Sequence, residues 1–546
     1  MIISKFQELY IENSRIHLGL PKITTDYKKK FLIIEIDGLS FSTLKRAIKN
    51  KNMPFMKQLR ERKYKLQPYY CGLPANTFST QTGIFYGKND SIPGFKFVDK
   101  KEQRRFSFLQ LRHAKHLEEK YYKNSFGILK DGSSLTTTFS GNATNTILTL
   151  SKILDSTGPT HLSFYRYLTY YTLNPFFVSR ILYYSTKEFL IELKENVYDI
   201  MKRITTGKRV NHLFSYPLFP FKRIFGNSIF KELSVFGSML EMQRNVPYIY
   251  LSLIGYDELA HFRGPFSHSA RSQLLELDRA IKRIYKYSKG YDVYIISDHG
   301  MTPAIPFDRV FHYSLEEFIE DCIEKNVKSD FSNQNPRLDL LNLKLKRLKK
   351  YFYKPINLII KVALSYPKST EIPSKIEKNS IILEISSNLA HLYFTHTSKQ
   401  LNLFDINKKY PYLLDNLIQH PGVGIVLGKQ NNKIYINNKF GRIIINNKIK
   451  FKGKRFLQDY GNEKILIKQI KDFMKIKNIG DLIIIGNYDG KNMVSFNPGH
   501  LGTHTAFGGE QGQAFFMSKQ NLDLSKVTNA RELFPIFEKY HKINKK

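Results

Sequence analysis

Short, nearly continuous apolar runs are the dominant pattern along the chain. They are FLIIEI at residues 31–36, YIYLSLI at 248–254, YDVYIIS at 291–297 and LIIIG at 482–486. Runs that are apolar at consecutive positions, rather than at alternate ones, are typical of strands buried on both faces of a sheet. We therefore predict four buried strands, the first of them of the parallel type.

Amphipathic segments follow two of these runs. Residues 43–61 have helical character that is interrupted near Pro54, and apolar residues recur at helical spacing over residues 274–284, with charged residues between them. Strands that alternate with helices predict an α/β sheet whose parallel strands are joined by right-handed crossovers.

Composition narrows the class of protein. The chain has 546 residues, and its 42% of hydrophobic residues excludes an intrinsically disordered chain. Two cysteines, Cys71 and Cys322, exclude a disulfide scaffold and a cysteine-based zinc module. The 85 Lys and Arg residues outnumber the 47 Asp and Glu residues, which gives a formal net charge of +38. So basic a chain is typical of proteins that bind nucleic acid or an anionic membrane.

Several basic or aromatic segments lie outside the predicted strands. Residues 344–361 predict a strongly cationic helix interrupted by a proline, and residues 433–453 predict a β-hairpin with Asn-Asn turns. Residues 162–185 are rich in Tyr, Phe, Leu and Ile. They favour either a buried helical hairpin broken at Asn174-Pro175 or a surface that lies at a membrane interface.

Neither a membrane span nor a signal peptide is predicted. No apolar run reaches the roughly 18 residues of a spanning helix. The opening MIISKFQELYIENSR mixes Lys, Glu and Arg among its apolar positions, unlike a signal peptide. We therefore expect a cytoplasmic protein, with peripheral contact between its basic segments and the inner face of an anionic membrane as an open option.

Acidic and histidine residues follow three of the four apolar runs. Asp37 follows the first, Asp257 the second and the pair Asp298-His299 the third, and His261 comes four residues after Asp257. Because the carboxyl ends of parallel strands meet at one edge of a sheet, we expect these side chains to lie close together. Carboxylates and imidazoles form a ligand set suited to zinc or manganese. Taken alone, each residue also fits a helix cap or a turn.

A hydroxyl-rich loop, CGLPANTFSTQTG at residues 71–83, leads into the predicted start of a helix. Its candidate nucleophiles are Thr77, Ser79, Thr80 and Thr82. The amino end of a helix stabilises a bound anion, and a neighbouring metal lowers the pKa of a hydroxyl, so the position suits nucleophilic catalysis. The alternative is that these hydroxyls only cap the helix.

A late Gly-rich loop brings two further imidazoles. The segment NPGHLGTHTAFGG at residues 497–509 contains His500 and His504. It is too polar for the core, and its glycines allow close approach of the backbone to a ligand. A mobile surface loop is the alternative.

In this order, the motifs resemble those of the alkaline phosphatase superfamily, and within it the type I phosphodiesterase/nucleotide pyrophosphatase-like branch. The resemblance rests on five motifs: IIEIDG at Asp37, LPANTFSTQTG at Thr77, GYDELAHFRGP at Asp257, IISDHGM at Asp298 and GTHTAFGG at His504. It implies an alkaline-phosphatase-like three-layer α/β sandwich with a mainly parallel central sheet and helical insertions.

The resemblance also implies two divalent metals, most suitably zinc, with manganese as the second choice. The ligands of the first would be Asp37, Asp298 and His299, and those of the second Asp257, His261 and His504. Thr77 would bind the first metal and act as the nucleophile, forming a phospho-threonyl intermediate. Asn76, beside it, can donate a hydrogen bond to a phosphoryl oxygen.

The sequence departs from the family pattern at two motifs. Ser79 stands where the family often has a proline, and Gly502-Thr503-His504-Thr505 stands where the pattern reads Gly-Ser-His-Gly, which leaves His500 as the alternative to His504. The chain has no Cys/Ser-x-Pro-x-Arg segment at the nucleophile, and this disfavours a sulfatase of the formylglycine type.

We predict one large α/β domain with insertions. Its segments are an N-terminal extension at 1–30, core at 31–100, a mainly helical cap-like insertion at 101–240, core at 241–304, a basic helical insertion at 305–375 and a C-terminal core segment at 376–546. Substrate identity is expected to depend on the insertions.

The function predicted is hydrolysis of a small phosphodiester or phosphoanhydride. A phosphotransferase would use the same residues, and a catalytically silent protein that binds membranes or polyanions on the same fold is the third reading. The charge of +38 also favours the hypothesis that the chain binds or processes nucleic acid. No nucleic-acid-binding module is recognisable, so specific nucleic-acid binding is not expected.

Overall fold

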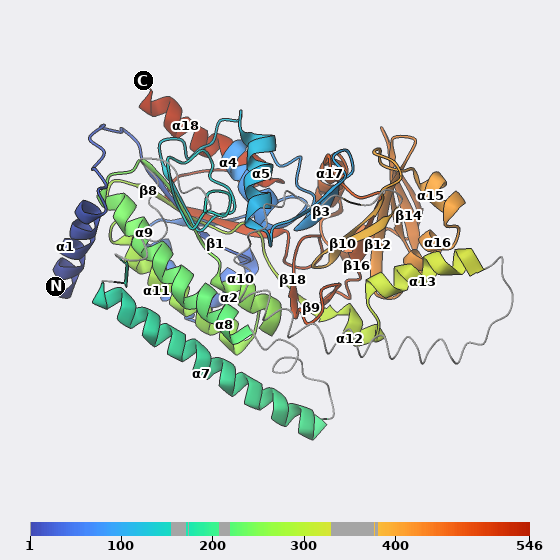
Figure 1. Ribbon diagram of the computed structural model, residues 1–546, viewed down its shortest axis with the longest axis horizontal. Coiled ribbons are helices and arrows are strands. Elements are labelled where there is room, and N and C mark those ends of the chain that lie inside the picture. Colours follow the sequence, from blue (N-terminus) through green and yellow to red (C-terminus); the bar gives the residue numbers. More distant parts are fainter. Residues whose placement is uncertain are drawn as a thin grey trace.

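The computed structural model describes residues 2–153, 171–172, 174–206, 219–328, 376 and 380–545. The predicted cationic helix at 344–361 and the first part of the aromatic segment at 162–185 lie outside these residues. Figure 1 shows a mixed α/β molecule in which helices cover a central sheet and a second sheet lies beside it.

The central sheet has seven strands in the order β2-β19-β8-β1-β7-β5-β6. β1 pairs in parallel with β7 on one side and with β8 on the other, and β5 and β6 continue in the same direction beyond β7. Within this sheet, β19 runs antiparallel to both of its neighbours, β8 and β2. The strands are β1 Phe31–Ile36, β2 Lys65–Tyr70, β5 Ser133–Leu135, β6 Asn145–Ile147, β7 Tyr248–Leu253, β8 Asp292–Ile296 and β19 Gln513–Ser518. The predicted α/β fold with a mainly parallel central sheet is confirmed.

Helices pack against both faces of this sheet. Alternate side chains of β1 point to opposite faces; all of them are buried, and all except Glu35 are apolar. Leu32 and Ile34 belong to a buried core shared with helices on one face, and Phe31 and Ile33 belong to a core shared with helices on the other. The first face carries α2 Phe41–Lys49, α3 Pro54–Glu61, α9 Lys231–Gln243 and α11 His268–Tyr285. The second carries α4 Thr77–Tyr86, α5 Leu111–Tyr122 and α18 Phe534–Asn544. The sheet therefore lies between two helical layers, as Figure 1 shows.

Both predicted helical segments are present. The segment at 43–61 forms two helices, α2 and α3, and Pro54 is the first residue of α3, where its missing N–H removes no helical hydrogen bond. The segment at 274–284 lies within α11, and its apolar residues, Leu274 and Ile281 among them, are buried. α2 and α3 connect β1 to β2, and α11 lies between β7 and β8. Each of these two connections joins strands that run in the same direction, as the alternating pattern indicates.

Residues 482–486 do form a buried strand, β16 Leu482–Gly486, but it lies in the second sheet rather than in the central one. The order there is β10-β11-β16-β12-β13-β14-β15, and every pairing is antiparallel. The other strands are β10 Ile381–Ser386, β11 Leu389–Phe394, β12 Val423–Gln430, β13 Lys433–Asn438, β14 Gly441–Ile445 and β15 Ile449–Gly453. The predicted hairpin at 433–453 is thus a meander of three strands. Helices α15 Leu403–Lys409, α16 Leu413–Gln419 and α17 Glu463–Phe473 accompany this sheet.

Residues 101–240, predicted as a mainly helical insertion, contain strands in their first half. β4 Arg104–Ser107 pairs with β3 Lys96–Asp99, and β5 and β6 extend the central sheet. β5 and β6 have three residues each, which is too short for a period to be read from the sequence. Beyond α5, the helices in the described part of this range are α7 Pro175–Thr206, α8 Phe219–Ile224, a π-helix over Phe225–Phe230 and α9.

Further helices and a small third sheet accompany the two large sheets. α1 Ile2–His17 packs against α9, and the described part of the basic insertion at 305–375 consists of α12 Phe307–Phe311 and α13 Leu315–Lys328. β9 Thr302–Pro306 pairs with β17 Met493–Ser495 and with β18 Gly502–Thr503. Of the helices described, α7 is the longest at 32 residues, and none of them is long and apolar enough to cross a membrane.

Candidate active site

The carboxyl ends of three adjacent parallel strands bring acidic and histidine side chains to one edge of the central sheet. β1 ends at Ile36, directly before Asp37, and β8 is followed by Asp298 and His299. β7 leads into α10 Gly255–Arg263, which carries Asp257. Because β1 lies between β7 and β8, these strand ends meet.

Asp37, Asp298 and His299 form one compact group, in which one ligand atom from each lies within 4.8 Å of the others. His299 Nε2 is 3.5 Å from Asp37 Oδ1 and 3.1 Å from Asp298 Oδ2. All three residues are buried. The structure therefore brings together the three side chains that the sequence motifs assign to the first metal.

A second group contains Asp257, His299 and His504, with its ligand atoms also within 4.8 Å of one another. His261 adjoins it: its Nε2 lies 3.4 Å from Asp257 Oδ2 and 3.0 Å from His504 Nε2. The ligands predicted for the second metal thus meet. His299 belongs to both groups and joins them, which the motifs did not indicate.

The three imidazoles of these groups share one hydrogen-bond pattern. The Nδ1 atoms of His261, His299 and His504 lie 2.9, 3.0 and 2.9 Å from the backbone oxygens of Gly502, Gly300 and Ala75, respectively. A carbonyl only accepts, so each Nδ1 donates its hydrogen there, and Nε2 is the ring nitrogen of each residue that is left to bind a metal. All three Nε2 atoms face carboxylates. The contact of the other ring nitrogen with a backbone carbonyl is the arrangement that fixes histidine ligands on a metal.

The site concentrates negative charge in a buried position. Burial raises the pKa of Asp37 well above its ordinary value, and the nearby carboxylates of Asp298 and Asp257 raise it further. Burial and Asp298 raise the pKa of Glu35 to about 8. Burial also raises the pKa of Asp257, but His261 and His504 lower it by more, so that carboxyl titrates below its usual range.

Two of these buried carboxylate oxygens, Asp257 Oδ1 and Asp298 Oδ2, have no hydrogen-bond partner. An unpaired buried carboxylate is costly unless a cation balances it. The mixed oxygen and nitrogen donors suit zinc or manganese. The residues present therefore fit two divalent cations.

Thr77 is the hydroxyl that meets the first group. Its Oγ1 lies 3.3 Å from Asp37 Oδ1 and 3.3 Å from His299 Nε2, and Thr77 is the first residue of α4. Thr82 Oγ1 instead donates to the backbone oxygen of Ser79. The Oγ atoms of Ser79 and Thr80 are buried and have no hydrogen-bond partner. Of the four hydroxyls considered from the sequence, Thr77 is the one placed to act on a ligand of this site.

Asn76 caps α4 and keeps a free donor. Its Oδ1 accepts a hydrogen bond of 2.9 Å from the N–H of Ser79. Its Nδ2 is buried without a partner, and the residue lines the same cavity as Thr77. An oxyanion bound beside Thr77 would satisfy that N–H group.

Between the two histidines of the late loop, His504 is the one that joins the ligand groups. The ring of His500 packs against that of His261, with 4.5 Å between centroids, but His500 belongs to neither group. Thr505 adopts φ +107°, a value that favours glycine. The backbone thus takes the shape expected of the glycine that the family pattern places here, with a threonine in its position.

Gly38 and Glu35 are site residues that the sequence analysis did not assign. Gly38 has φ +73°, and a Cβ built on it would lie 2.5 Å from Asp257 Oδ1, so only glycine fits. Its N–H donates to Asp298 Oδ1 at 3.1 Å. Glu35 accepts from Gln81 and from the hydroxyl of Tyr250 beneath the site. A glutamate within the apolar run FLIIEI was the available signal.

A cavity of about 530 Å³ lies over the site. The polar part of its lining includes Asp37, Thr77 and His504, and its apolar part includes Phe78, Phe108 and other aromatic and aliphatic side chains. The rings of Phe78 and Phe108 stack with 3.9 Å between centroids. A ligand would place its charged end at the carboxylate–histidine groups and its remainder against an apolar wall.

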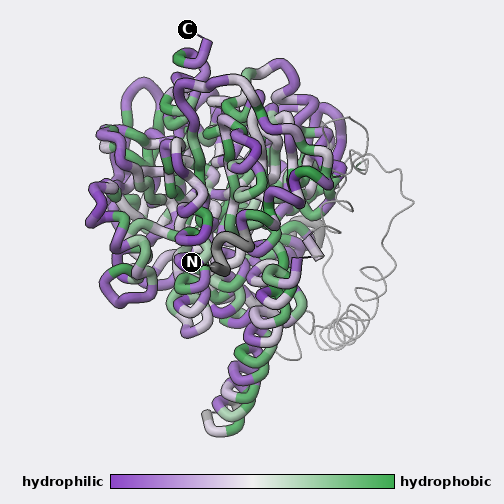
Figure 2. Tube along the Cα trace, turned by 90° about the vertical axis from the view of Figure 1, so that its left-hand side faces the viewer, coloured by the Kyte–Doolittle hydropathy of each residue, from purple (hydrophilic) through white to green (hydrophobic). Residues whose placement is uncertain are grey.

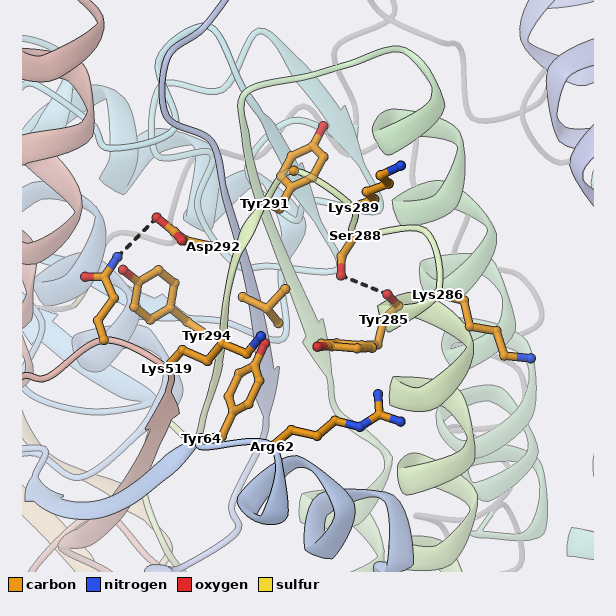
Figure 3. Close-up of a pocket in the computed structure, with 13 residues that line it drawn as sticks. Arg62, Tyr64, Tyr285, Lys286, Ser288, Lys289, Tyr291, Asp292, Tyr294 and Lys519 are labelled. Carbon is orange, nitrogen blue, oxygen red and sulfur yellow. Dashed lines mark hydrogen bonds between the residues drawn. The ribbon is translucent and has the colours of Figure 1, made fainter.

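A second cavity, of about 540 Å³, lies at the opposite edge of the central sheet, where β8 begins (Figure 3). Tyr64, Tyr285 and Lys519 point toward one another across it, and Arg62 and Lys286 lie nearby. None of its lining residues belongs to a carboxylate–histidine group among the described residues. It is therefore not the candidate active site.

Comparison with known proteins gives a matching family model and similar solved structures. A family model described as type I phosphodiesterase/nucleotide pyrophosphatase matches residues 31–379. Phosphonoacetate hydrolase from Sinorhizobium meliloti 1021, in complex with phosphonoformate, is 11% identical, with coverage of 96% of this chain and 100% of that chain and a TM-score of 0.43. Murine ectonucleotide pyrophosphatase/phosphodiesterase 5, an inactive variant in complex with AMP, is 10% identical, with coverage of 94% and 95% and a TM-score of 0.45. No curated protein sequence matches the chain significantly.

Proposed function

The chain belongs to the type I phosphodiesterase/nucleotide pyrophosphatase family, and from this premise we propose that it hydrolyses phosphodiesters or phosphoanhydrides through a two-metal site and a phospho-threonyl intermediate. The family match confirms the resemblance seen in the motifs and makes phosphoester hydrolysis the expected chemistry. The observation that carries the proposal is the position of Thr77 Oγ1, 3.3 Å from both Asp37 Oδ1 and His299 Nε2.

Two sets of side chains would hold the metals. Asp37, Asp298 and His299 would bind one, together with Thr77, and Asp257, His261 and His504 would bind the other. Two divalent cations bound there neutralise charge on the attacking and leaving oxygens of an in-line displacement at phosphorus.

The residues of the chain then perform a double displacement. The Thr77 hydroxyl gives up its proton to solvent and its Oγ attacks the phosphorus, so the Oγ–P bond forms while the bond from phosphorus to the leaving oxygen breaks. The leaving group departs with the electron pair and takes up a proton from solvent. Water next attacks the phosphorus of phospho-Thr77, which releases phosphate or a phosphate monoester and returns the hydroxyl. The Nδ2 of Asn76 would donate to a phosphoryl oxygen throughout, since that group has no other partner.

Hydrolysis of chromogenic esters tests this proposal. The purified chain, supplied with Zn²⁺ or Mn²⁺, is expected to hydrolyse bis-p-nitrophenyl phosphate and to leave p-nitrophenyl sulfate intact. The aromatic groups of bis-p-nitrophenyl phosphate also suit the apolar wall of the cavity. Absence of turnover of every phosphodiester and phosphoanhydride, after metal binding has been verified, would overturn the proposal in favour of a catalytically silent binding protein.

A phosphotransferase remains the second candidate, because Thr77 would form the same intermediate. Adding a small alcohol to the assay separates the two functions. A hydrolase yields mainly the product of attack by water, whereas a transferase yields mainly the ester of the added alcohol. The cavity gives no observation that favours transfer.

Replacing Asn76 with serine tests its assignment to the phosphoryl oxygen. Serine caps a helix about as well as asparagine, so stability should change by less than about 0.5 kcal/mol. Serine cannot replace Nδ2, and kcat for a phosphodiester should fall by about 10²-fold, as when one donor to a developing oxyanion is removed. Steady-state kinetics and thermal melting measure the two effects. Wild-type kcat in a stable Asn76→Ser protein would contradict the assignment.

A further inference from the structure

The long helix α7 has its polar side toward the protein and its apolar side toward solvent. Glu188, Glu192 and Asn196, spaced four residues apart, are buried, each less than 5% exposed. The exposed side carries large apolar residues: Leu182, Tyr183, Phe189, Leu190, Leu193, Val197, Tyr198, Ile200, Met201 and Ile204. Figure 1 shows α7 along the border of the molecule, and Figure 2 shows a projecting helix with hydrophobic residues along it. This is the reverse of the usual amphipathic surface helix.

Buried ion pairs hold the helix in this orientation. Arg223 of α8 lies 2.6 Å from Glu188 and 2.8 Å from Glu192. Arg263 of α10 lies 2.5 Å from Glu192 and 2.6 Å from Asp199. Removing one partner of a buried pair leaves an uncompensated charge, so this face of α7 cannot readily turn outward. The apolar face is therefore fixed toward solvent.

Two lysines stand among the exposed residues of α7. The acidic side chains of α7 are directed to Arg223 and Arg263, whereas Lys194 and Lys202 of the same helix are exposed. Two exposed aromatic residues, Phe221 and Phe225, lie on the neighbouring α8 and π-helix, which pack against α7. No described element covers these side chains.

We propose that this face of α7, defined as its ten exposed apolar residues together with Lys194 and Lys202, docks on the headgroup region of an anionic phospholipid bilayer. Apolar side chains flanked by lysines are the composition of helices that lie in a membrane interface. Anionic lipid also complements the charge of +38, which opposes packing of this face against a second copy of the chain. The proposal goes beyond the phosphoester chemistry and does not depend on it.

Docking at this face would place the active-site cavity near the lipid surface. α10, to which α7 is ion-paired through Arg263, also carries Asp257 and His261. Lys222 of α8 and Phe262 of α10 line the cavity over the site. The docking helix is thus joined directly to the helix that supplies metal ligands.

The chain contains no tryptophan, so a single introduced indole reports on one position. Tyr198→Trp places it on the docking face, and Phe404→Trp places it on α15 at a residue with the same exposure, 64% for each. With vesicles of phosphatidylglycerol and phosphatidylcholine, the emission of Tyr198→Trp should shift to shorter wavelength and be quenched by brominated acyl chains. The emission of Phe404→Trp should be unaffected. Equal quenching of both, or of neither, would overturn the proposal.

Two further variants separate the apolar and ionic parts of the contact. Leu190→Gln/Leu193→Gln should lower vesicle affinity about tenfold or more, measured by co-sedimentation at high salt, where ionic attraction is screened. Lys194→Glu/Lys202→Glu should weaken binding to anionic vesicles at low salt. Both should melt at the same temperature as the wild-type chain, which shows that they fold. Unchanged vesicle binding in both variants would contradict docking on lipid. So would a wild-type chain that binds no vesicles and forms a dimer that the variants do not form.

Discussion

Thr77→Ala is expected to lower kcat for a phosphodiester by about 10⁴-fold or more, the scale seen when a covalent nucleophile is removed. Thr77 Oγ1 lies at the first ligand group, and no other hydroxyl of α4 contacts that group. Without it, no phosphoenzyme can form, and any residual turnover must come from direct attack by water at the same metals. Steady-state kinetics with bis-p-nitrophenyl phosphate measure the loss.

Two matched variants give this prediction its controls. Thr77→Ser keeps the oxygen and loses only a methyl group, so its kcat should stay within about tenfold of the wild-type value. Thr80→Ala removes a hydroxyl of the same helix that has no hydrogen-bond partner and should change kcat little. Phosphorylation should be found, after rapid acid quenching, on the peptide that contains Thr77. Wild-type turnover by Thr77→Ala, or phosphate on another residue, would refute the assignment.

The central strands could be predicted because they are buried on both faces. β1, β7 and β8 are apolar at nearly all consecutive positions, and an acidic residue follows the end of each strand within four residues. The motif order then placed Asp37, Asp257 and Asp298 at one sheet edge, where the structure has them. The same reasoning failed for β16, because consecutive apolarity shows burial but not which sheet buries the strand.

Contacts between distant segments could not be read from the sequence. His504 Nδ1 bonds to the carbonyl of Ala75, 429 positions away, and this contact holds the ring of His504 beside the ligand groups. Thr77 and Asp37 are 40 positions apart, so no local spacing distinguished Thr77 from Ser79 or the other hydroxyls of that loop.

The outward face of α7 shows the same limit. The pattern of residues 162–185 favours either a buried helical hairpin or a membrane interface, and no buried face was predicted for the rest of α7. α7 begins at Pro175, where the break was predicted, and Asn174 accepts from the N–H groups of Phe176 and Phe177 at the start of the helix. The side that is buried is the acidic one, because Arg223 and Arg263 arrive from other segments of the chain. Helical spacing identifies two faces but not the partner of either.

Asp298→Asn is expected to have opposite effects on activity and on the stability of the metal-free protein. It removes a ligand of the first metal, so kcat should fall by about 10³-fold, a loss on the scale of several kcal/mol of transition-state stabilisation by a metal. Without metal, however, Asp298 is a fully buried carboxylate beside Asp37, and its Oδ2 has no hydrogen-bond partner. The charge that binds the cation therefore opposes folding when the cation is removed.

In the metal-free protein, asparagine at position 298 can form hydrogen bonds with both of its side-chain polar atoms. Its Oδ1 can still accept from the N–H of Gly38, 3.1 Å from Asp298 Oδ1. Its Nδ2, at the place of Oδ2, can donate to His299 Nε2, which lies 3.1 Å away and keeps its lone pair. Replacing an unpaired charge by a hydrogen-bonded amide should stabilise the metal-free protein by about 1–3 kcal/mol.

Thermal melting of both proteins in EDTA and in Zn²⁺ distinguishes this account from a simple loss of structure. Zn²⁺ should raise the Tm of the wild-type chain strongly and that of Asp298→Asn much less, while EDTA should leave the variant as the more stable protein. Asp278→Asn is the control, because Asp278 is buried, lies outside the ligand groups and accepts from the N–H groups of Phe55 and Met56. Its effect on Tm should be the same in both conditions. If Asp298→Asn were destabilised in EDTA, or if Zn²⁺ raised no Tm, the carboxylates would be structural groups rather than ligands, and the two-metal mechanism would lose its basis.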